Sequence, residues 1–268
     1  MLVPPLETMF ASLTGVEEEE VRPARVGLLS GCVQAGLFGR VNDATGRVLK
    51  ANGFAAVTPT AQVCCGALHS HAGDLETAQA LARLNVAAFA SADVEAIVVN
   101  AAGCGAAMKG YAQLLADDAE YGPRAVAISE KVVDISEILV RYGMRRGGPV
   151  PARVTYDAPC HLLHAQGVAD APLEMLRSVP QLEMVELKGC EECCGGAGIY
   201  GITHHELGGA IGSDKVDAIM ETKAEAVVTG NPGCMMQIGA ELRSRGAGVE
   251  TLHPVELVDE SYRRGGVY

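Results

Sequence analysis

The chain of 268 residues is 49% hydrophobic and 20% charged, a balance typical of a globular protein that is long enough for two domains with buried cores. Its net charge of −12 argues against nucleic acid and anionic membrane surfaces as direct partners. No apolar run approaches the roughly 20 residues that cross a bilayer, and the opening residues lack the basic start of a cleavable export signal.

Residues 1–25 differ from the rest of the chain. They contain a Pro4-Pro5 pair and an acidic run at residues 17–20, and they show no periodic pattern. Such a stretch predicts a linker-like N-terminal tail with a solvated acidic segment. We expect two lobes to follow it, residues 26–150 and residues 151–268.

Three strands, alternating with helices, are predicted in each lobe. Each predicted strand is a short run of β-branched or apolar residues, and apolar residues at helical spacing mark the segments between them. The predicted strands are residues 26–32, 54–57 and 96–100 in the first lobe and residues 154–160, 183–187 and 226–230 in the second. Strands that alternate with helices indicate a parallel sheet with helices on both faces. The fold class is therefore expected to be α/β, with two Rossmann-like lobes.

Eight of the nine cysteines form two sets of four at matching places in the two lobes. Equivalent members are separated by 128, 129 or 130 residues. The first set is Cys32, Cys64, Cys65 and Cys104, and the second set is Cys160, Cys193, Cys194 and Cys234. The repeated spacing indicates an internal duplication, which predicts two lobes related by a pseudo-twofold axis.

Each cysteine of a set lies where a predicted strand ends. The carboxyl ends of parallel strands share one edge of the sheet, and open α/β sheets bind ligands there. Four thiolates from several chain segments suit the soft iron of an iron–sulfur cluster, and the N–H groups of the following helices would offset its negative charge. Zinc also accepts four thiolates, so zinc at one site or both stays open as an alternative.

Nine cysteines without an export signal favour the reducing cytosol, where such spacings indicate metal or redox chemistry rather than disulfides. We therefore expect a cytoplasmic protein that reaches a membrane only through a partner.

Cys190 is the unmatched ninth cysteine, three residues before Cys193. It is either a fifth ligand or redox-active neighbour of the second centre, or a free loop thiol.

Several histidines follow cysteines in the sequence. His69 and His71 come after the first vicinal pair, and His161 and His164 come after Cys160. His69 and His161 are either hydrogen-bond donors or proton relays at a cluster, or ordinary polar loop residues.

The cysteine pattern resembles the duplicated cysteine-rich, or CCG, domain over essentially residues 26–263. The motifs that carry the resemblance are Gly31-Cys32-Val33-Gln34, Cys64-Cys65-Gly66, Asp157-Ala158-Pro159-Cys160-His161, Cys193-Cys194-Gly195-Gly196 and His253-Pro254-Val255-Glu256-Leu257. The sequence is most similar to the C-terminal part of the glycolate oxidase iron-sulfur subunit. It is also similar to the heterodisulfide reductase B subunit and to lactate-utilisation proteins.

The resemblance implies one [4Fe–4S] cluster in each lobe, held by the eight matched cysteines. It also implies an electron-transfer subunit. Such a subunit would take electrons from an FAD-binding oxidoreductase that acts on a 2-hydroxy acid such as glycolate, and pass them towards a quinone or another carrier.

Two departures from the family pattern matter. No ferredoxin-type cysteine run precedes Cys32, so we expect a ferredoxin-type iron-sulfur protein or domain as a further partner. Ala101 and Asn231 stand where the related heterodisulfide reductase chain has additional cysteines, which argues against its five-thiolate cluster.

No dinucleotide fingerprint, phosphate-binding loop or nucleophile elbow is present, so we expect a non-catalytic iron-sulfur subunit. Two alternatives stay open. One is a thiol/disulfide or quinone reductase component of the heterodisulfide reductase kind, and the other is a zinc-binding assembly scaffold. We expect the second centre, with Cys190 and more glycines nearby, to differ from the first in coordination or reactivity.

Overall fold

The computed structural model describes residues 25–268, so the predicted tail lies outside the described residues except for Arg25. Two four-stranded parallel sheets form the frame, and their strands have the same order along the chain. The first sheet has the order β2-β1-β3-β4, with β1 (Arg25–Leu28), β2 (Ala55–Val57), β3 (Ala96–Val99) and β4 (Val132–Asp134). The second has the order β6-β5-β7-β8, with β5 (Ala152–Tyr156), β6 (Leu182–Val185), β7 (Ala226–Val228) and β8 (Glu250–Leu252). The duplicated α/β fold predicted from the sequence is confirmed.

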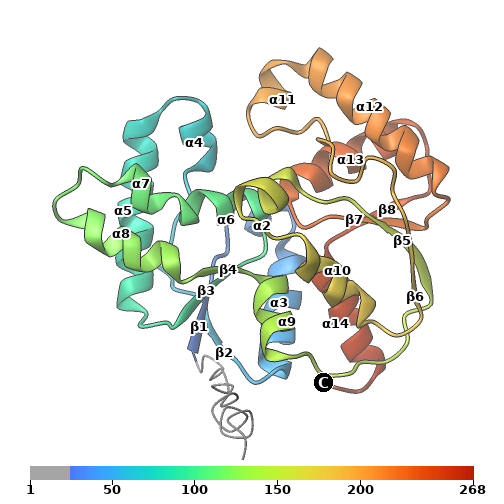
Figure 1. Cartoon of the computed structure of the whole chain (residues 1–268), viewed down its shortest axis with the longest axis horizontal. Helices are drawn as coiled ribbons and strands as arrows, with labels where there is room; N and C mark the ends of the chain where they lie inside the picture. The colour runs from blue at the N-terminus through green and yellow to red at the C-terminus, as the bar shows by residue number, and fades with distance from the viewer. Residues whose placement is uncertain (1–24) are drawn as a thin grey trace, which may run out of the picture.

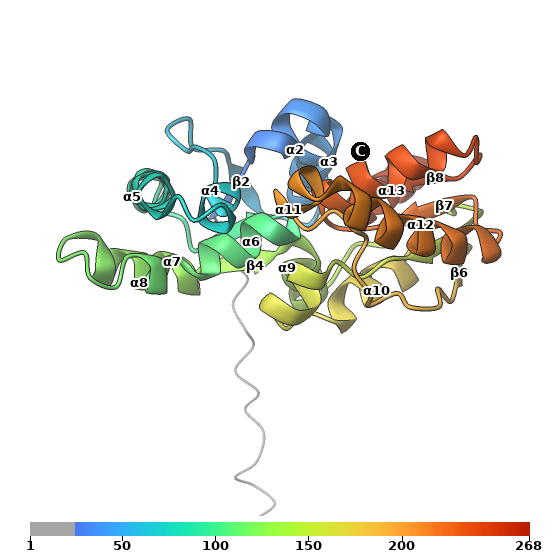
Figure 2. The ribbon, with the colours of Figure 1, turned by 90° about the horizontal axis from the view of Figure 1, so that it is seen from above.

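Helices cover both faces of each sheet. Figure 2 shows α2 and α3 on one side of the first lobe and α7, α8 and α9 on the other. The helices of the first lobe are α2 (Cys32–Leu37), α3 (Gly39–Ala51), α4 (Ala67–His71), α5 (Leu75–Ser91), α6 (Ala102–Lys109), α7 (Tyr111–Leu114), α8 (Tyr121–Glu130) and α9 (Ile135–Tyr142). Those of the second are the π-helix η1 (His161–Ala165), α10 (Asp170–Arg177), α11 (Tyr200–Thr203), α12 (His205–Glu221), α13 (Pro232–Ser244) and α14 (Pro254–Arg264).

The sequence prediction missed the fourth strand of each sheet. β4 and β8 have only three residues each, which is too short for an alternating pattern to stand out. Each is followed at once by a capped helix, since Asp134 begins a capping box at α9 and His253 begins one at α14. The predicted strands were also one to three residues longer than the observed ones, because runs such as residues 26–32 were extended to a cysteine that begins the following helix.

The two lobes pack through helices that occupy equivalent places. α3 of the first lobe packs on α14 of the second, and α10 of the second packs on α9 of the first. Because α3 corresponds to α10 and α9 corresponds to α14, exchanging the lobes exchanges these two contacts. The helices lie together in the centre of the molecule (Figure 1), as a pseudo-twofold arrangement requires.

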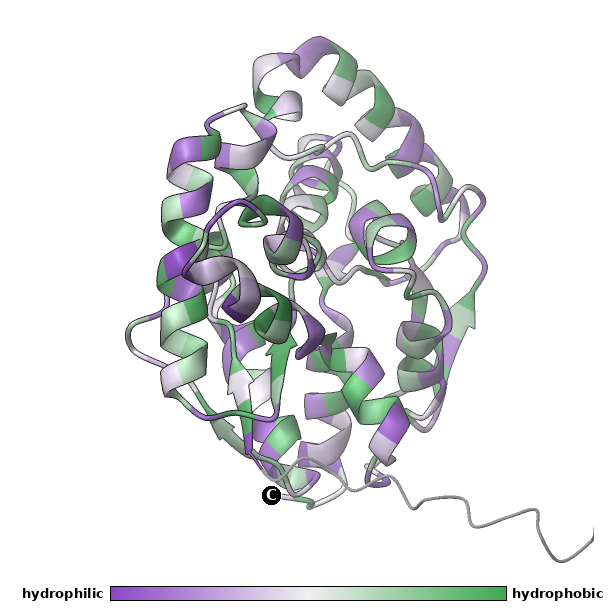
Figure 3. Ribbon diagram, turned by 60° about the vertical axis from the view of Figure 1, so that its left-hand side comes forward, coloured by the Kyte–Doolittle hydropathy of each residue, from purple (hydrophilic) through white to green (hydrophobic). Residues whose placement is uncertain are grey.

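One hydrophobic core runs through this contact. It includes Val26 and Val154 from the two sheets, together with Leu49, Leu176 and Val258 from the packed helices, and all five are at most 5% exposed. The long helices in Figure 3 alternate between hydrophilic and hydrophobic residues, as helices with one buried face do. Burial of apolar surface at this contact therefore holds the lobes together.

A bidentate ion pair adds to the contact at its edge. Arg47 of α3 donates from Nε and a terminal nitrogen to the two carboxylate oxygens of Asp259 on α14, at 2.8 and 2.9 Å. The Asp259 side chain is 6% exposed.

None of the helices within residues 25–268 combines the length and the apolar character that a membrane span requires.

Candidate metal centres

The first set of cysteines gathers at the carboxyl edge of the first sheet. Cys32 begins α2, Cys64 and Cys65 lie in the loop between β2 and α4, and Cys104 lies in the first turn of α6. The Sγ atoms of Cys32 and Cys64 are 3.3 Å apart, and so are those of Cys65 and Cys104. The ends of three strands thus bring together two close pairs of sulfur atoms, and the peptide bond between Cys64 and Cys65 links the two pairs.

Buried polar groups hold the vicinal loop of the first set in place. Asn85 on α5 accepts a hydrogen bond from the N–H of Val63 at 2.9 Å and donates to the carbonyl oxygen of Cys64 at 3.0 Å. The Tyr111 hydroxyl donates to the carbonyl oxygen of Cys65 at 2.8 Å. Gly66 has a φ of 81°, and its N–H points at Cys64 Sγ at 3.5 Å. The left-handed turn that aims this N–H at sulfur favours glycine.

The second set has the same placement in the second lobe. Cys160 precedes η1, Cys193 and Cys194 lie in the loop between β6 and α11, and Cys234 lies in the first turn of α13. The thiols of Cys160 and Cys193, of Cys193 and Cys194, and of Cys194 and Cys234 lie close enough to shift one another's pKa. All four sulfurs therefore lie within one connected group.

Two donors point at sulfurs of the second set. The N–H of Gly195 lies 3.3 Å from Cys193 Sγ, and the side-chain amide of Asn231 donates to Cys234 Sγ at 3.4 Å. N–H groups aimed at sulfur stabilise a thiolate and raise the reduction potential of a cluster bound to it. Asn231, one of the two residues expected to replace additional cysteines, thus contributes a hydrogen-bond donor to the set.

The two sets differ in how their thiols ionise. In the first set, a hydrogen bond with Cys65 raises the pKa of Cys64, and one with Cys104 raises the pKa of Cys65. In the second set, hydrogen bonds from Cys160 and Cys194 lower the pKa of Cys193, with the charge of Lys215 contributing. Neighbouring thiols and the charge of Lys215 thus favour the thiolate form at Cys193.

The residues present fit a thiolate-bound cluster. All nine cysteines are free thiols, and every matched donor is sulfur, the ligand type that iron–sulfur clusters use. Within residues 25–268, no three Cys, His, Asp or Glu side chains are arranged around a position for a single metal ion. The sulfurs lie instead in hydrogen-bonded pairs and chains at the two sheet edges.

Residues 26–109 and residues 154–239 each match the cysteine-rich (CCG) domain family. The chain belongs to this family. Its two lobes are therefore two cysteine-rich domains, as the resemblance of the motifs implied.

Several relatives match this chain across both of its cysteine-rich domains. The chain is 38% identical over 242 residues to the "Probable glycolate oxidase iron-sulfur subunit" of Bacillus subtilis, covering 88% of this chain and 54% of that protein. It is 32% identical over 247 residues to the "Glycolate oxidase iron-sulfur subunit" of Escherichia coli, covering 90% and 58%. It is 32% identical over 245 residues to "Lactate utilization protein A" of Oceanobacillus iheyensis, covering 91% and 99%. The chain thus spans little more than half the length of the first two relatives and nearly all of the third.

Cys190 lies at the edge of the second cysteine-rich domain's core. Its side chain is partly buried against a cluster that contains Leu187, Cys194 and Cys234. Its carbonyl oxygen accepts a hydrogen bond from the N–H of Ala158 at 3.0 Å. The ninth cysteine is therefore close to the second set, although its role as a ligand stays a prediction.

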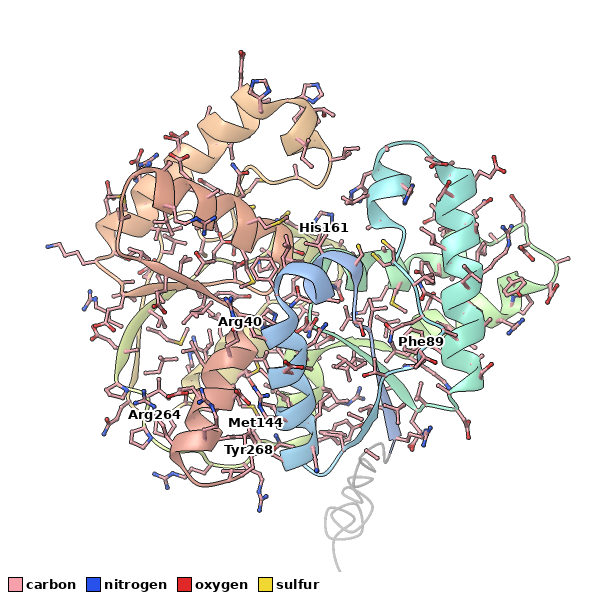
Figure 4. All side chains as sticks on the ribbon, turned by 180° about the vertical axis from the view of Figure 1, so that it is seen from behind. Arg40, Phe89, Met144, His161, Arg264 and Tyr268 are labelled. Atoms are coloured by element: carbon pink, nitrogen blue, oxygen red, sulfur yellow. The ribbon has the colours of Figure 1, made fainter. Side chains whose placement is uncertain are left out.

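Some of the histidines lie on the surface, and others lie close to the cysteine sets. His69 pairs with Asp74 at 3.2 Å on the exposed end of α4. The ring of His71 stacks on that of His161 from the other cysteine-rich domain, with centroids 5.6 Å apart. His161 Nδ1 lies 3.7 Å from Cys160 Sγ, and Figure 4 shows His161 between the two lobes. This cross-lobe stack was not expected from the sequence, because His71 and His161 are 90 residues apart.

A hollow of about 560 Å³ opens beside the first set. It is lined by Cys65, His71 and His161, together with apolar residues of α4, α6 and α7 that include Ala106 and Leu114. A space of this size, with apolar walls and a few polar groups, can accept a small molecule. Cys65 thus lines a hollow that reaches from the first set to His161 of the second domain.

Proposed function

We propose that this chain is an iron-sulfur electron-transfer subunit of an oxidoreductase complex that oxidises a 2-hydroxy acid. The observation that carries the proposal is the pair of matched four-thiol sets, each at the carboxyl edge of a parallel sheet and each with a glycine N–H aimed at sulfur. The names of the relatives, iron-sulfur subunit of glycolate oxidase and lactate utilization protein, support the choice of substrate class.

Each set would hold one cluster, proposed as [4Fe–4S]. The ligands would be Cys32, Cys64, Cys65 and Cys104 in the first cysteine-rich domain and Cys160, Cys193, Cys194 and Cys234 in the second. A bound cluster supplies one-electron transfer. The protein keeps the vicinal sulfurs in fixed positions through Asn85 and Tyr111, and its glycine N–H groups offset the negative charge.

Oxidation of a 2-hydroxy acid to a 2-oxo acid releases two electrons and two protons. A flavin can take both electrons from the substrate and release them singly. We therefore propose an FAD-binding oxidoreductase as one partner and a ferredoxin-type iron-sulfur protein or domain as another. The electrons would leave towards a quinone or another carrier, in the cytoplasm or at a membrane reached through these partners.

A reductase that acts on thiols or disulfides, or on a quinone, is the second candidate function. The hollow beside Cys65 favours it, because a small molecule there would contact a residue of the first set. A zinc-binding assembly scaffold is the third candidate, because four thiolates also suit zinc.

Metal and sulfide analysis of anaerobically purified protein tests the proposal. We expect iron and acid-labile sulfide in equal amounts, a broad visible absorption that bleaches on reduction by dithionite, and an EPR signal in the reduced state. Zinc without sulfide would overturn the proposal in favour of the scaffold.

Purification from native extract under anaerobic conditions tests the partners. We expect an FAD-binding oxidoreductase, a ferredoxin-type protein, or both to copurify. An isolated chain that oxidised a 2-hydroxy acid by itself would contradict the assignment as an electron-transfer subunit.

A further inference from the structure

A buried ion pair lies behind the second cysteine set. Lys215 on α12 places Nζ 2.9 Å from Oδ1 of Asp157, and the side chains are only 2% and 1% exposed. Thr229 at the end of β7 donates a hydrogen bond to the other carboxylate oxygen at 3.1 Å. Burial of two charges is costly and does not by itself stabilise a fold, so this pair calls for an explanation beyond packing.

The ammonium group of Lys215 also binds the chain just before the vicinal cysteines. Nζ donates to the carbonyl oxygen of Gly189 at 2.6 Å and lies 3.5 Å from that of Cys190. Gly189 has a φ of 68°, so the turn depends on a residue without a side chain. One cation thus holds the turn that places Cys190 and leads into Cys193.

The first lobe has no charge at the equivalent positions. α5 and α12 have 17 residues each and are offset by 130 positions, so Asn85 corresponds to Lys215. By the offsets of the neighbouring cysteines, Leu29 corresponds to Asp157 and Val99 to Thr229. Asn85 and Lys215 both donate hydrogen bonds to the backbone of the loop that carries the vicinal cysteines. The donor is a neutral amide in the first lobe and a cation in the second.

We infer that Lys215 is a positioning residue of the second centre, which fixes the Cys190 turn and keeps a positive charge behind Cys193 that the first centre lacks. The inference rests on the proposed function in so far as a cluster occupies the second set. A nearby cation favours the more negative, reduced form of a cluster, and Asp157 offsets part of that effect. The two centres therefore differ in reduction potential, and Lys215 is the reason for part of the difference.

Three variants of the full chain distinguish the hydrogen bonds that Lys215 makes to the Cys190 turn from the effect of its positive charge on the second centre. Lys215→Met removes the ammonium and leaves Asp157 buried without a counter-charge. Asp157→Leu combined with Lys215→Met removes both charges and reproduces the leucine of the first lobe, which protects the test if the single variant fails to fold. Thr229→Val reproduces Val99 and is the matched control, because it removes one hydrogen bond and keeps the ammonium.

Two measurements are made on each anaerobically purified protein. The first is the rate at which iodoacetamide alkylates Cys190, followed by mass spectrometry and compared with the rate in the wild-type protein. We expect a severalfold faster reaction at Cys190 in both variants that lack Lys215, and an unchanged rate in Thr229→Val. The second is a redox titration followed by EPR. We expect one of two reduction waves to move to lower potential in Lys215→Met and to return towards its wild-type position in the double variant, while the other wave stays.

Unchanged alkylation of Cys190 in the double variant would overturn the anchoring role. Movement of both waves together, or of neither, would overturn the electrostatic role. A wild-type protein without iron would instead refute the proposed function and the electrostatic role with it. The alkylation result would still decide whether Lys215 holds the turn.

Discussion

The imidazole Nε2 of His253 lies 2.9 Å from the backbone carbonyl oxygen of Asn100, so the second lobe is hydrogen-bonded to the end of β3 in the first. The other ring nitrogen, Nδ1, accepts a hydrogen bond from the N–H of Val255 at 3.1 Å and thereby caps α14. Both bonds are satisfied only by a neutral ring with its proton on Nε2. The contact therefore couples the lobe interface to the protonation state of one buried histidine.

Acid should weaken the fold through His253. Burial lowers the pKa of this histidine to about 3, whereas an unfolded histidine titrates near its ordinary value of 6.5. Between these values the unfolded state binds the extra proton, so the free energy of unfolding falls as the pH falls, by up to about 1.4 kcal/mol for each pH unit. Urea denaturation at pH 7, 6 and 5 measures the slope. His253→Asn, which can still cap the helix, should show a shallower slope, and an equal slope in both proteins would refute the assignment.

Asp134 should act in the opposite direction. It stands where His253 stands in the second lobe, and burial raises its pKa from 3.8 to about 6. The folded state therefore binds the extra proton between these values, and the stability that Asp134 contributes is lost as the pH rises from about 4 to 6. The two effects partly cancel in the wild type. Asp134→Asn should therefore lose stability more steeply than the wild type between pH 6 and 4 in the same denaturation series.

The glycine after the second vicinal pair should be essential to the second centre. Gly195 has a φ of 84°, and a Cβ there would lie 2.2 Å from the carbonyl oxygen of Gly208 on α12. We expect Gly195→Ala to cost about 3 kcal/mol or more and to disrupt the second set, because strain and a backbone clash combine. Thermal unfolding and iron content measure both effects.

Gly209→Ala is the matched control for this substitution. Gly209 lies on the same helix, and a Cβ there meets nothing within 4 Å. Alanine should raise the stability by about 0.5–1 kcal/mol, because it is the better helix former. Equal losses in the two variants would show that the region does not tolerate any added methyl group, and that the turn at Gly195 is not special.

The two centres should load independently if the proposed function is correct. Cys65→Ser and Cys194→Ser replace the same vicinal position in the two lobes, and both residues are 4% exposed. Each variant should retain about half of the wild-type iron, because four thiolates serve one cluster. Iron and sulfide analysis, with an EPR spectrum of each variant, makes the test. Complete loss of iron in either variant would mean that the two sets assemble as one unit.

Cys190 should affect only the second centre. Its side chain packs against the core cluster that includes Cys194 and Cys234, and Ala61 stands at the corresponding position of the first lobe. We expect Cys190→Ser to change the EPR signal or the oxygen sensitivity of the second centre and to leave the first as in the wild type. A variant that matches the wild type in iron content, EPR and electron transfer would make Cys190 a bystander.

Local sequence patterns were enough to predict the general form of the fold. Each predicted three-strand unit corresponds to three observed strands, because β-branched runs and helical spacing are properties of neighbouring residues. The matched offsets of the eight cysteines also predicted the duplication, since a repeat keeps its spacing. β4 and β8 were not predicted, because a strand of three residues is too short to show an alternating pattern of apolar and polar residues.

Contacts between distant residues were decided only by the tertiary structure. Lys215 meets Asp157 across 58 positions, and Arg47 meets Asp259 across 212. His253 reaches Asn100 across 153 positions. No spacing rule links such pairs, because loop lengths and helix packing set their distance. The sequence alone determined which residues carry sulfur and that these residues follow strands. The packing of the two lobes decided which charges and rings lie beside that sulfur.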